Sequence, residues 1–291
     1  MDGHAKQFVD HMRTLLLPKE ALPYPERRQF LATQPTPYPE HFYHFRGYEG
    51  PNDERNLRDF LVHSRFFLRC PRDFNDPFEC RFQFGALGTI TDLYDRFVES
   101  ATLQGTPRHI ASSNASEVLL KIDPKVIAEN AKKDTLSRFN ALGIFCLCES
   151  YKDILMWGHY GQSHRGVCVE FDIAEGVRTF GLCLKVRYDN AMPVLDYPER
   201  SPRDLFNPIV RKSEHWRYER EWRIAIPSGS HQYIEFPPSA VKSVIYGCEA
   251  TDATKKVVQD LLKDRASAGH AAVKERTLAR SENTYELVEA P

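Results

Sequence analysis

The sequence predicts an α+β protein with a mostly antiparallel sheet, continuous or split, and a segregated layer of helices. Runs of residues typical of strands occur near residue 45 and again after residue 142. A long helical pattern fills 91–140 between them, and most loops that join the strands are too short for repeated helical crossovers. A doubly wound parallel sheet would alternate strands with helices, so this order argues against it.

Length and composition limit the class of protein. The chain has 291 residues, of which 42% are hydrophobic, and this excludes a wholly disordered chain. With 39 basic and 40 acidic residues the net charge is −1, so nucleic acid is not indicated as a partner. No membrane-spanning run or signal peptide is recognisable, and seven scattered cysteines predict a reducing compartment. We therefore expect a soluble cytoplasmic protein without membrane partners.

The N-terminal part, 1–40, is predicted to be a proline-rich appendage packed on a single α+β domain of 41–291. Its first segment, 8–17, has the pattern of a short amphipathic helix that Pro18 ends. The prolines between residues 23 and 39 then favour extended, irregular chain.

The domain begins with the aromatic run 41–46, which is typical of a core strand. A helix capped by Asn52 or Asp53 should extend to about residue 62, with a short strand after it at 64–69. The following turn, rich in Asn, Asp and Pro, is expected to bury Phe78 as a plug of the core.

The remaining elements follow from periodicity. The helical stretch 91–140 is interrupted by Pro124, and its apolar spacing predicts five inner positions, Leu119, Leu120, Val126, Ile127 and Ala131. Further strands are expected at 143–148, 166–172, 182–188, 221–226 and 241–246, followed by a helix over 251–265 and an edge strand at 285–288.

The segment 215–226 is the first candidate for a site. Side chains alternate across a strand, so Trp222 and its apolar neighbours would face one way. Glu219, Glu221 and Arg223 would then share the opposite surface. The alternative is a solvent-facing row of weakly paired charges.

The segment 153–162 is the second candidate. Trp157, His159 and Tyr160 lie at helical spacings beside two glycines, and such a wall can grip a flat heterocycle. The alternative is a buried helical turn in which His159 is a satisfied core residue.

Two weaker signals come from strands. His44 and Arg46 share one face of the first strand, where they could hold a ribose hydroxyl and a phosphate. Cys146 and Cys148 are one residue apart, whereas zinc sites space their cysteines by two to four residues around a turn. We therefore expect no bound metal.

In their order along the chain, several motifs resemble the bacterial family catalogued as domain of unknown function 2971. The resemblance covers roughly residues 40 to 290 and implies no known reaction. The motifs are Tyr43-His44-Phe45-Arg46, Asn75-Asp76-Pro77-Phe78-Glu79, Met156-Trp157-Gly158-His159-Tyr160, the segment Trp216 to Ile224, and Val244-Ile245-Tyr246-Gly247.

A more distant resemblance is to ADP-ribosyltransferases, which hold NAD in a split sheet and carry a late Glu-x-Glu. Glu219-Arg220-Glu221 has that form. This resemblance implies that Glu221 stabilises the charge that develops on the ribose, while Glu219 orients the acceptor. It also implies that His44 or Arg46 occupies the first strand of the site.

The same resemblance implies how NAD would be held as the substrate. Trp157 or Tyr160 would stack on the nicotinamide near His159, and Arg46 or Arg65 would contact the pyrophosphate. Two classes of function follow. The chain is either an enzyme that transfers ADP-ribose to an unknown macromolecular acceptor or to water, by analogy a toxin or phage-defence effector, or a non-catalytic module that senses a nucleotide or a protein.

Overall fold

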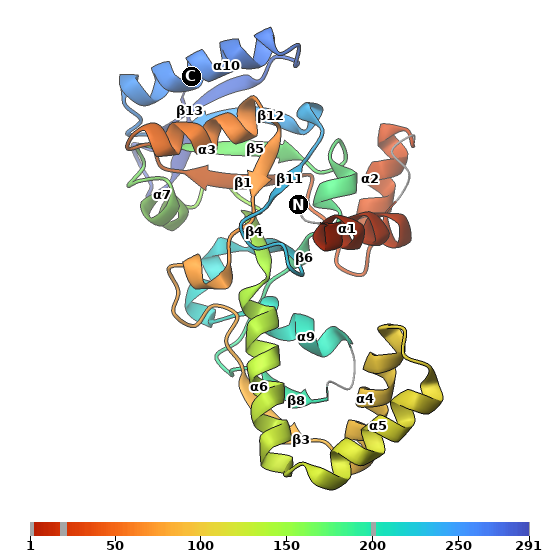
Figure 1. The fold of residues 1–291 in the computed structure, drawn as a ribbon. Helices are drawn as coiled ribbons and strands as arrows, with labels where there is room; N and C mark the ends of the chain where they lie inside the picture. The colour runs from red at the N-terminus through yellow and green to blue at the C-terminus, as the bar shows by residue number, and fades with distance from the viewer. Residues whose placement is uncertain (1–2, 18–21, 199–201, 291) are drawn as a thin grey trace.

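The computed structural model describes residues 3–17, 22–198 and 202–290, and it confirms the α+β class (Figure 1). The helices are α1 (Gly3–Leu16), α2 (Tyr24–Ala32), α3 (Pro51–Leu61), α4 (Ile90–Leu103), α5 (Arg108–Lys121), α6 (Pro124–Asn140), α7 (Ile154–Tyr160), α8 (Val177–Phe180), α9 (Pro202–Ile209) and α10 (Asp252–Ser267), with 3-10 helices η1 (Pro71–Asp73), η2 (Glu214–Glu219) and η3 (Pro238–Ala240).

The strands are β1 (His41–Arg46), β2 (Arg65–Phe67), β3 (Gln83–Leu87), β4 (Gly143–Cys148), β5 (Val167–Asp172), β6 (Leu184–Lys185), β7 (Arg187–Tyr188), β8 (Val194–Tyr197), β9 (Arg211–Lys212), β10 (Glu221–Ile226), β11 (Tyr233–Glu235), β12 (Val241–Tyr246), β13 (Lys274–Arg280) and β14 (Leu287–Glu289). Eight of them form one sheet in the order β14-β13-β12-β5-β1-β4-β10-β6, and all neighbours are antiparallel except β12 and β13, which α10 connects.

The sheet separates the side chains of β10 as the alternation predicts. Trp222, Ile224 and Ile226 belong to the main core, which α3 and α10 cover on that face (Figure 1). Glu221 and Arg223 lie on the opposite face, but both are buried there. The alternative of a solvent-facing row of charges is therefore wrong.

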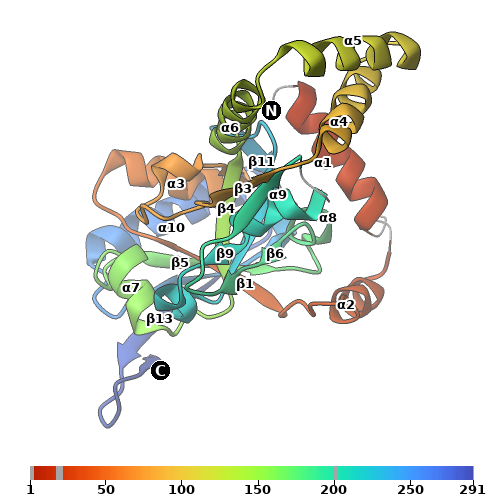
Figure 2. The ribbon, with the colours of Figure 1, turned by 90° about the horizontal axis from the view of Figure 1, so that it is seen from below.

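The helices between residues 90 and 140 form an arm instead of a layer on the sheet. In Figures 1 and 2, α4 and α5 project well beyond the sheet, and their small core includes Val98, Ala111 and Ala115. Two predicted inner positions are wrong, because Leu120 is 87% and Val126 45% exposed. Leu119 is half-buried, whereas Ile127 and Ala131 are buried as predicted.

The N-terminal prediction is partly wrong, since residues 24–32 form α2 instead of irregular chain. Pro25 occupies the first turn of this helix, where a missing N–H costs nothing. Val9 of α1 and Leu31 of α2 both reach the main core. Pro18, the predicted end of the first helix, lies outside the described residues.

Three smaller differences concern the domain itself. The helix predicted to start at Asn52 or Asp53 begins at Pro51, with Gly50 as its N-cap. Phe78 is 68% exposed, so it is not a plug of the core. The predicted strand over 182–188 is divided into β6 and β7.

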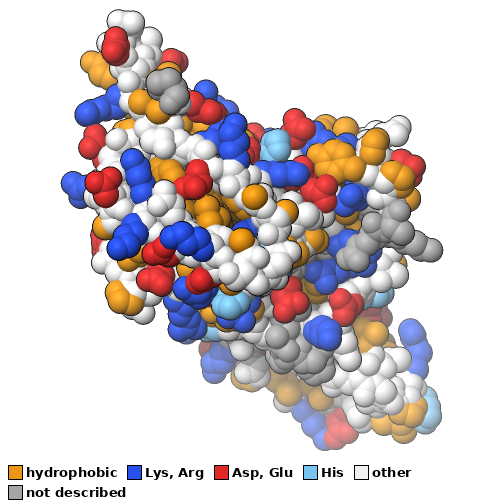
Figure 3. All heavy atoms as spheres, turned by 90° about the horizontal axis from the view of Figure 1, so that it is seen from above, with side chains coloured by type: hydrophobic (Ala, Val, Ile, Leu, Met, Phe, Trp, Pro, Cys, Tyr) orange, Lys and Arg blue, Asp and Glu red, His pale blue; other side chains and the backbone are white. Residues whose placement is uncertain are grey.

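The surface agrees with the near-neutral charge of the chain. Figure 3 shows acidic and basic side chains intermingled on the face seen from above. None of the helices within the described ranges is both long and apolar enough to span a membrane.

Candidate functional site

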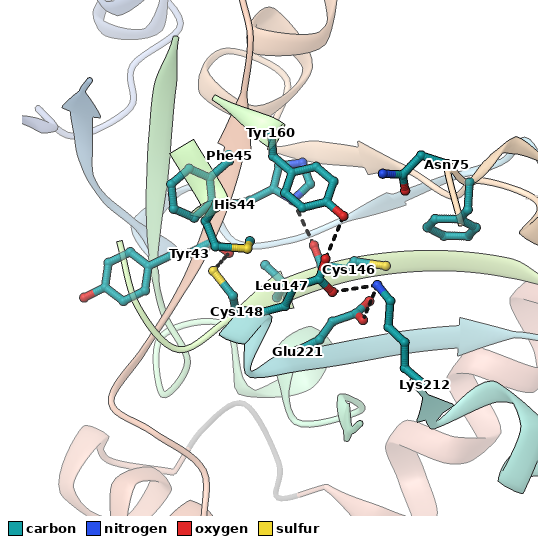
Figure 4. Close-up of a pocket in the computed structure, with 13 residues that line it drawn as sticks. Tyr43, His44, Phe45, Asn75, Cys146, Leu147, Cys148, Tyr160, Lys212 and Glu221 are labelled. Carbon is teal, nitrogen blue, oxygen red and sulfur yellow. Dashed lines mark hydrogen bonds and ion pairs between the residues drawn. The ribbon is translucent and has the colours of Figure 1, made fainter. Parts of the chain in front are cut away.

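A cavity of about 90 Å³ lies where β1 and β4 separate (Figure 4). These two neighbouring strands pair at a single position, Tyr43 with Cys148, and then diverge. The walls of the cavity come from β1, β4 and β10 of the sheet, from α7, η2 and β9, and from the loop after η1. The cavity has room for a few water molecules but not for a whole dinucleotide.

His44 bridges the two diverging strands. Its Nδ1 lies 2.8 Å from the carbonyl oxygen of Cys146, and its ring stacks on Phe145 with centroids 4.6 Å apart. Because a carbonyl only accepts, Nδ1 carries the proton. Burial lowers the pKa of His44 well below its usual value, and Arg46 adds to this effect. His44 is therefore neutral, and its hydrogen bond links β1 to β4 where the backbones of the two strands no longer pair.

Lys212 is the centre of the charges in the cavity. Its Nζ lies 2.6 Å from Oε2 of Glu219 and 3.4 Å from Oε2 of Glu221. A third carboxylate, that of Glu79, lies 3.7 Å away. The Lys212 side chain is only 6% exposed. One buried ammonium group thus contacts three carboxylates.

Arg223 completes this group of charges. Its Nε and Nη2 donate to the two oxygens of Glu221, each at 2.8 Å, and its Nη1 donates to Glu79 at 2.6 Å. The side chain is fully buried. A bidentate guanidinium–carboxylate pair of this kind is both strong and fixed in geometry. We call Glu79, Lys212, Glu219, Glu221 and Arg223 the charge cluster.

The two glutamates reach the cavity from different elements. Glu221 begins β10, but Glu219 ends η2, so the prediction that strand alternation places Glu219 beside Glu221 is wrong. Arg220 between them is in the left-handed region, with φ 44° and ψ 51°. A non-glycine residue adopts this conformation at a cost of order 1 kcal/mol. The turn lets both carboxylates converge on Lys212 although strand alternation does not apply to Glu219.

Tyr160 connects the cluster to α7. Its hydroxyl donates to Oε1 of Glu219 at 2.7 Å. Figure 4 shows Tyr160 and Lys212 converging from opposite sides of the cavity, with Asn75 near Tyr160. Both oxygens of Glu219 are therefore occupied, one by a neutral donor and one by a cation.

The two carboxyl groups differ in pKa. Burial raises the pKa of Glu219 to about 7, and the neighbouring charge of Glu221 adds to the increase. Burial also opposes the charge of Glu221, but Arg223 and Lys212 outweigh it and lower its pKa to about 2. The site therefore holds one carboxyl group that titrates near neutral pH and one that stays ionised.

The thiol of Cys146 and the amine of Lys212 are both inactive as nucleophiles. Burial raises the pKa of the Cys146 thiol well above its usual value, so the thiol stays protonated. Burial lowers the pKa of Lys212, but Glu221 and Glu219 outweigh this effect and raise it overall. Lys212 therefore remains a cation.

Four of the eight residues predicted for the site line the cavity, namely His44, Tyr160, Glu219 and Glu221. Trp157 is on the buried side of α7, and its Nε1 donates to the carbonyl oxygen of Tyr151. His159 is exposed and stacks near Tyr218. Neither ring lines the cavity.

The two predicted arginines also lie elsewhere. Arg46 lies on the same face of β1 as His44 but does not line the cavity, and its guanidinium is 5.5 Å from the centroid of the Phe60 ring. Arg65 pairs with Asp59 at 2.7 Å and lies over the ring of Tyr233. A pyrophosphate that contacted either arginine would be outside the cavity.

The sequence reasoning missed Lys212 and did not assign Glu79 to the site. Lys212 lies in a two-residue strand that has no apolar pattern. Glu79 ends a turn whose sequence is typical of a purely structural turn. No local sequence pattern identifies either residue as part of the site, because the three carboxylates meet only after β9, β10 and the loop after η1 are packed together.

The arrangement is not that of a metal centre. Within residues 3–17, 22–198 and 202–290, no group of three or more His, Cys, Asp or Glu side chains is arranged to hold a metal ion. The carboxylates of the charge cluster are already occupied by Lys212 and Arg223.

This chain is an α+β protein with a buried carboxylate site beside a separation in its sheet. Residues 156–224 match the family model described as "Protein of unknown function (DUF2971)", which supports the family resemblance predicted from the motifs. The matched segment contains four of the five members of the charge cluster and Tyr160. No curated protein and no solved structure matches the chain.

Proposed function

We propose that this protein is an ADP-ribosyltransferase-like enzyme that cleaves the nicotinamide–ribose bond of NAD and transfers ADP-ribose to an acceptor or to water. The observation that carries the proposal is the pair of carboxyl groups in one cavity, Glu219 and Glu221, with widely separated pKa values. Such pairs divide the work of acid–base catalysis and charge stabilisation at sugar carbons.

The net charge of the cluster supports a positively charged substrate. Three carboxyl groups face two cations, Lys212 and Arg223, so one negative charge remains when every carboxyl group is ionised. The nicotinamide ring of NAD is cationic, and its loss leaves an oxocarbenium-like ribose. A buried site with one uncompensated negative charge stabilises both species.

The reaction assigns a separate step to each glutamate. When the bond from C1′ of the ribose to the ring nitrogen breaks, nicotinamide leaves with the electron pair and C1′ becomes positively charged. Glu221 stabilises that charge as a carboxylate. The acceptor oxygen then bonds to C1′, and its proton passes to Glu219, which later releases it to solvent.

The positions of Arg46, Arg65, Trp157 and His159 give no support to the NAD contacts that the resemblance implies for them. Only the reacting end of NAD would therefore enter the cavity. An effector role, as a toxin or in phage defence, follows from analogy alone and stays part of the proposal.

A second candidate function rests on the state of Glu221. Both of its oxygens are bonded, to Arg223 and to Lys212, and the side chain is almost fully buried. A carboxylate whose charge is compensated by two cations also suits a non-catalytic module, which would bind a nucleotide or a protein without catalysing a reaction.

Incubation of the purified protein with NAD separates the two candidates. The enzyme predicts that free nicotinamide accumulates in proportion to protein concentration, as measured by liquid chromatography. The binding module predicts a higher melting temperature with NAD but no nicotinamide, because a ligand that binds only the folded state stabilises it.

A further inference from the structure

A large groove lies beside the cavity, between α6 and the loop that joins η1 to β3. It encloses about 820 Å³, and aromatic side chains form much of its wall. Phe82 packs on Phe84 and on Phe139, with ring centroids 4.9 and 4.8 Å apart. We call this feature the α6 groove. Phe82 and Phe84 are half-buried and offer flat apolar surfaces to a ligand, whereas Phe139 is buried.

Three basic side chains line the α6 groove without a carboxylate partner among the described residues. Arg72 donates to the side-chain oxygen of Asn140, and Arg81 donates to the carbonyl oxygen of Pro77. The ammonium group of Lys132 lies 5.4 Å from the centre of the Phe84 ring. Their positive charges are therefore available to an anionic ligand.

The two acidic residues of the groove do not cancel these charges. Asp76 is buried and accepts a hydrogen bond from the backbone N–H of Phe78. Glu79 is buried and pairs with Arg223 and Lys212 of the charge cluster. Lys212 and Arg223 compensate the charge of Glu79, so the three basic side chains face one carboxylate, that of Asp76, and the net charge of the α6 groove is positive.

The groove and the cavity adjoin each other. Phe74 lines both of them, and Glu79 belongs to the wall of the groove and to the charge cluster. The two spaces therefore share a wall at Phe74, and a ligand that fills the groove would reach Glu219 and Glu221 only past this ring. The cavity alone is too small for a dinucleotide, and the groove supplies the missing space.

We propose that the α6 groove binds the adenosine diphosphate part of a nucleotide substrate, with the phosphates at Arg72, Arg81 and Lys132 and the base on the phenylalanine rings. Basic side chains interspersed with aromatic rings suit this chemistry, since the cations contact phosphate and the rings stack on the base. That the ligand is a substrate, and not only a nucleotide, rests on the proposed function.

ADP tests the groove independently of catalysis, because ADP has no nicotinamide bond. Isothermal titration of ADP into the wild type, Lys132→Gln and Arg81→Gln should show Kd increased about tenfold in each variant, as expected for a lost charge-assisted contact. Lys133→Gln is the matched control, since Lys133 is exposed on the same helix but does not line the groove. Its Kd should stay within about twofold of the wild type.

Several results would overturn the groove proposal. They are the absence of ADP binding at millimolar concentration, an unchanged Kd in Lys132→Gln, and binding of a short single-stranded oligonucleotide in place of ADP. Equal melting temperatures of all variants would show that each is folded. If ADP binds as predicted but NAD is not cleaved, the groove stands and the proposed function fails. If NAD is cleaved and Lys132→Gln keeps the KM of the wild type, the function stands and the groove fails.

Discussion

Glu219 and Glu221 hold their carboxylates against the same ammonium group, although one residue ends a 3-10 helix and the other begins a strand. Lys212 supplies that group, and the left-handed turn at Arg220 makes the convergence possible. Two like charges would repel each other in a buried site if the cation were absent.

Lys212→Met should reduce the free energy of unfolding by about 3–5 kcal/mol, because it leaves buried carboxylates without their cation. Denaturant unfolding at neutral pH measures the loss. Lys185→Met is the matched control, since Lys185 pairs with Glu149 at 2.7 Å but is 43% exposed. The control should lose no more than about 1 kcal/mol. Equal losses in both variants would contradict a buried charge cluster.

Stability should also depend on the titration of Glu219. Its pKa is raised to about 7 in the folded protein from an ordinary value of 4.5. Between these values the folded state keeps a proton that the unfolded state has lost, so this stabilisation is complete below pH 4.5 and is lost as pH rises through 7. The loss amounts to about 3 kcal/mol.

Glu219→Gln cannot titrate and isolates this contribution. Measured by denaturant unfolding from pH 5 to pH 8, the variant should gain stability relative to the wild type as pH rises. Parallel curves for the two proteins would mean that Glu219 has an ordinary pKa.

Tyr160→Phe tests the neutral donor on Glu219. The hydroxyl of Tyr160 stabilises the ionised form of Glu219, so its removal should raise the pKa of Glu219 above 7. A carbon-13 NMR titration of the Glu219 carboxyl group reports that pKa directly. Tyr151→Phe serves as the control, because its hydroxyl bonds to Glu289 and not to the cluster. An unchanged pKa of Glu219 in Tyr160→Phe would show that the Tyr160 hydroxyl does not stabilise the ionised form of Glu219.

The strands of the main sheet were predictable because their side chains alternate or are uniformly apolar. The alternation placed Trp222 in the core and Glu221 on the opposite face, and both assignments are confirmed. β13 was missed, because its sequence Lys-Glu-Arg-Thr-Leu-Ala-Arg contains few apolar residues. It joins the sheet through its parallel neighbour β12, which is a tertiary relationship.

The site was only half predictable for a similar reason. Glu221 and Tyr160 belong to recognisable motifs, whereas Lys212 has no local signal and meets Glu79 only in the folded chain. Propensity also misjudged the turn after η1, where Phe78 points to solvent while the polar Glu79 is buried. Pairing with Arg223 makes that burial possible.

Phe78 provides a simple check of that turn. Phe78→Ser should change the free energy of unfolding by less than about 0.5 kcal/mol, because the ring is 68% exposed. Phe66→Ala, at a fully buried ring, should cost about 3–5 kcal/mol. A large loss of unfolding free energy in Phe78→Ser would mean that Phe78 packs in the core, as the sequence predicted.

Nicotinamide release from NAD by the wild type, Glu221→Gln and Glu219→Gln tests the central claim most directly. Glu221→Gln keeps the shape of the side chain but removes the charge that would face the reacting ribose, so release should fall about a hundredfold or more. Glu219→Gln should mainly reduce transfer to an acceptor and lower release far less, because its proton transfer follows bond cleavage. The variants should keep the NAD-induced increase in melting temperature. If the wild type releases nicotinamide and Glu221→Gln releases it at the same rate, the carboxylate of Glu221 has no part in the chemistry and the proposed function of this site is contradicted.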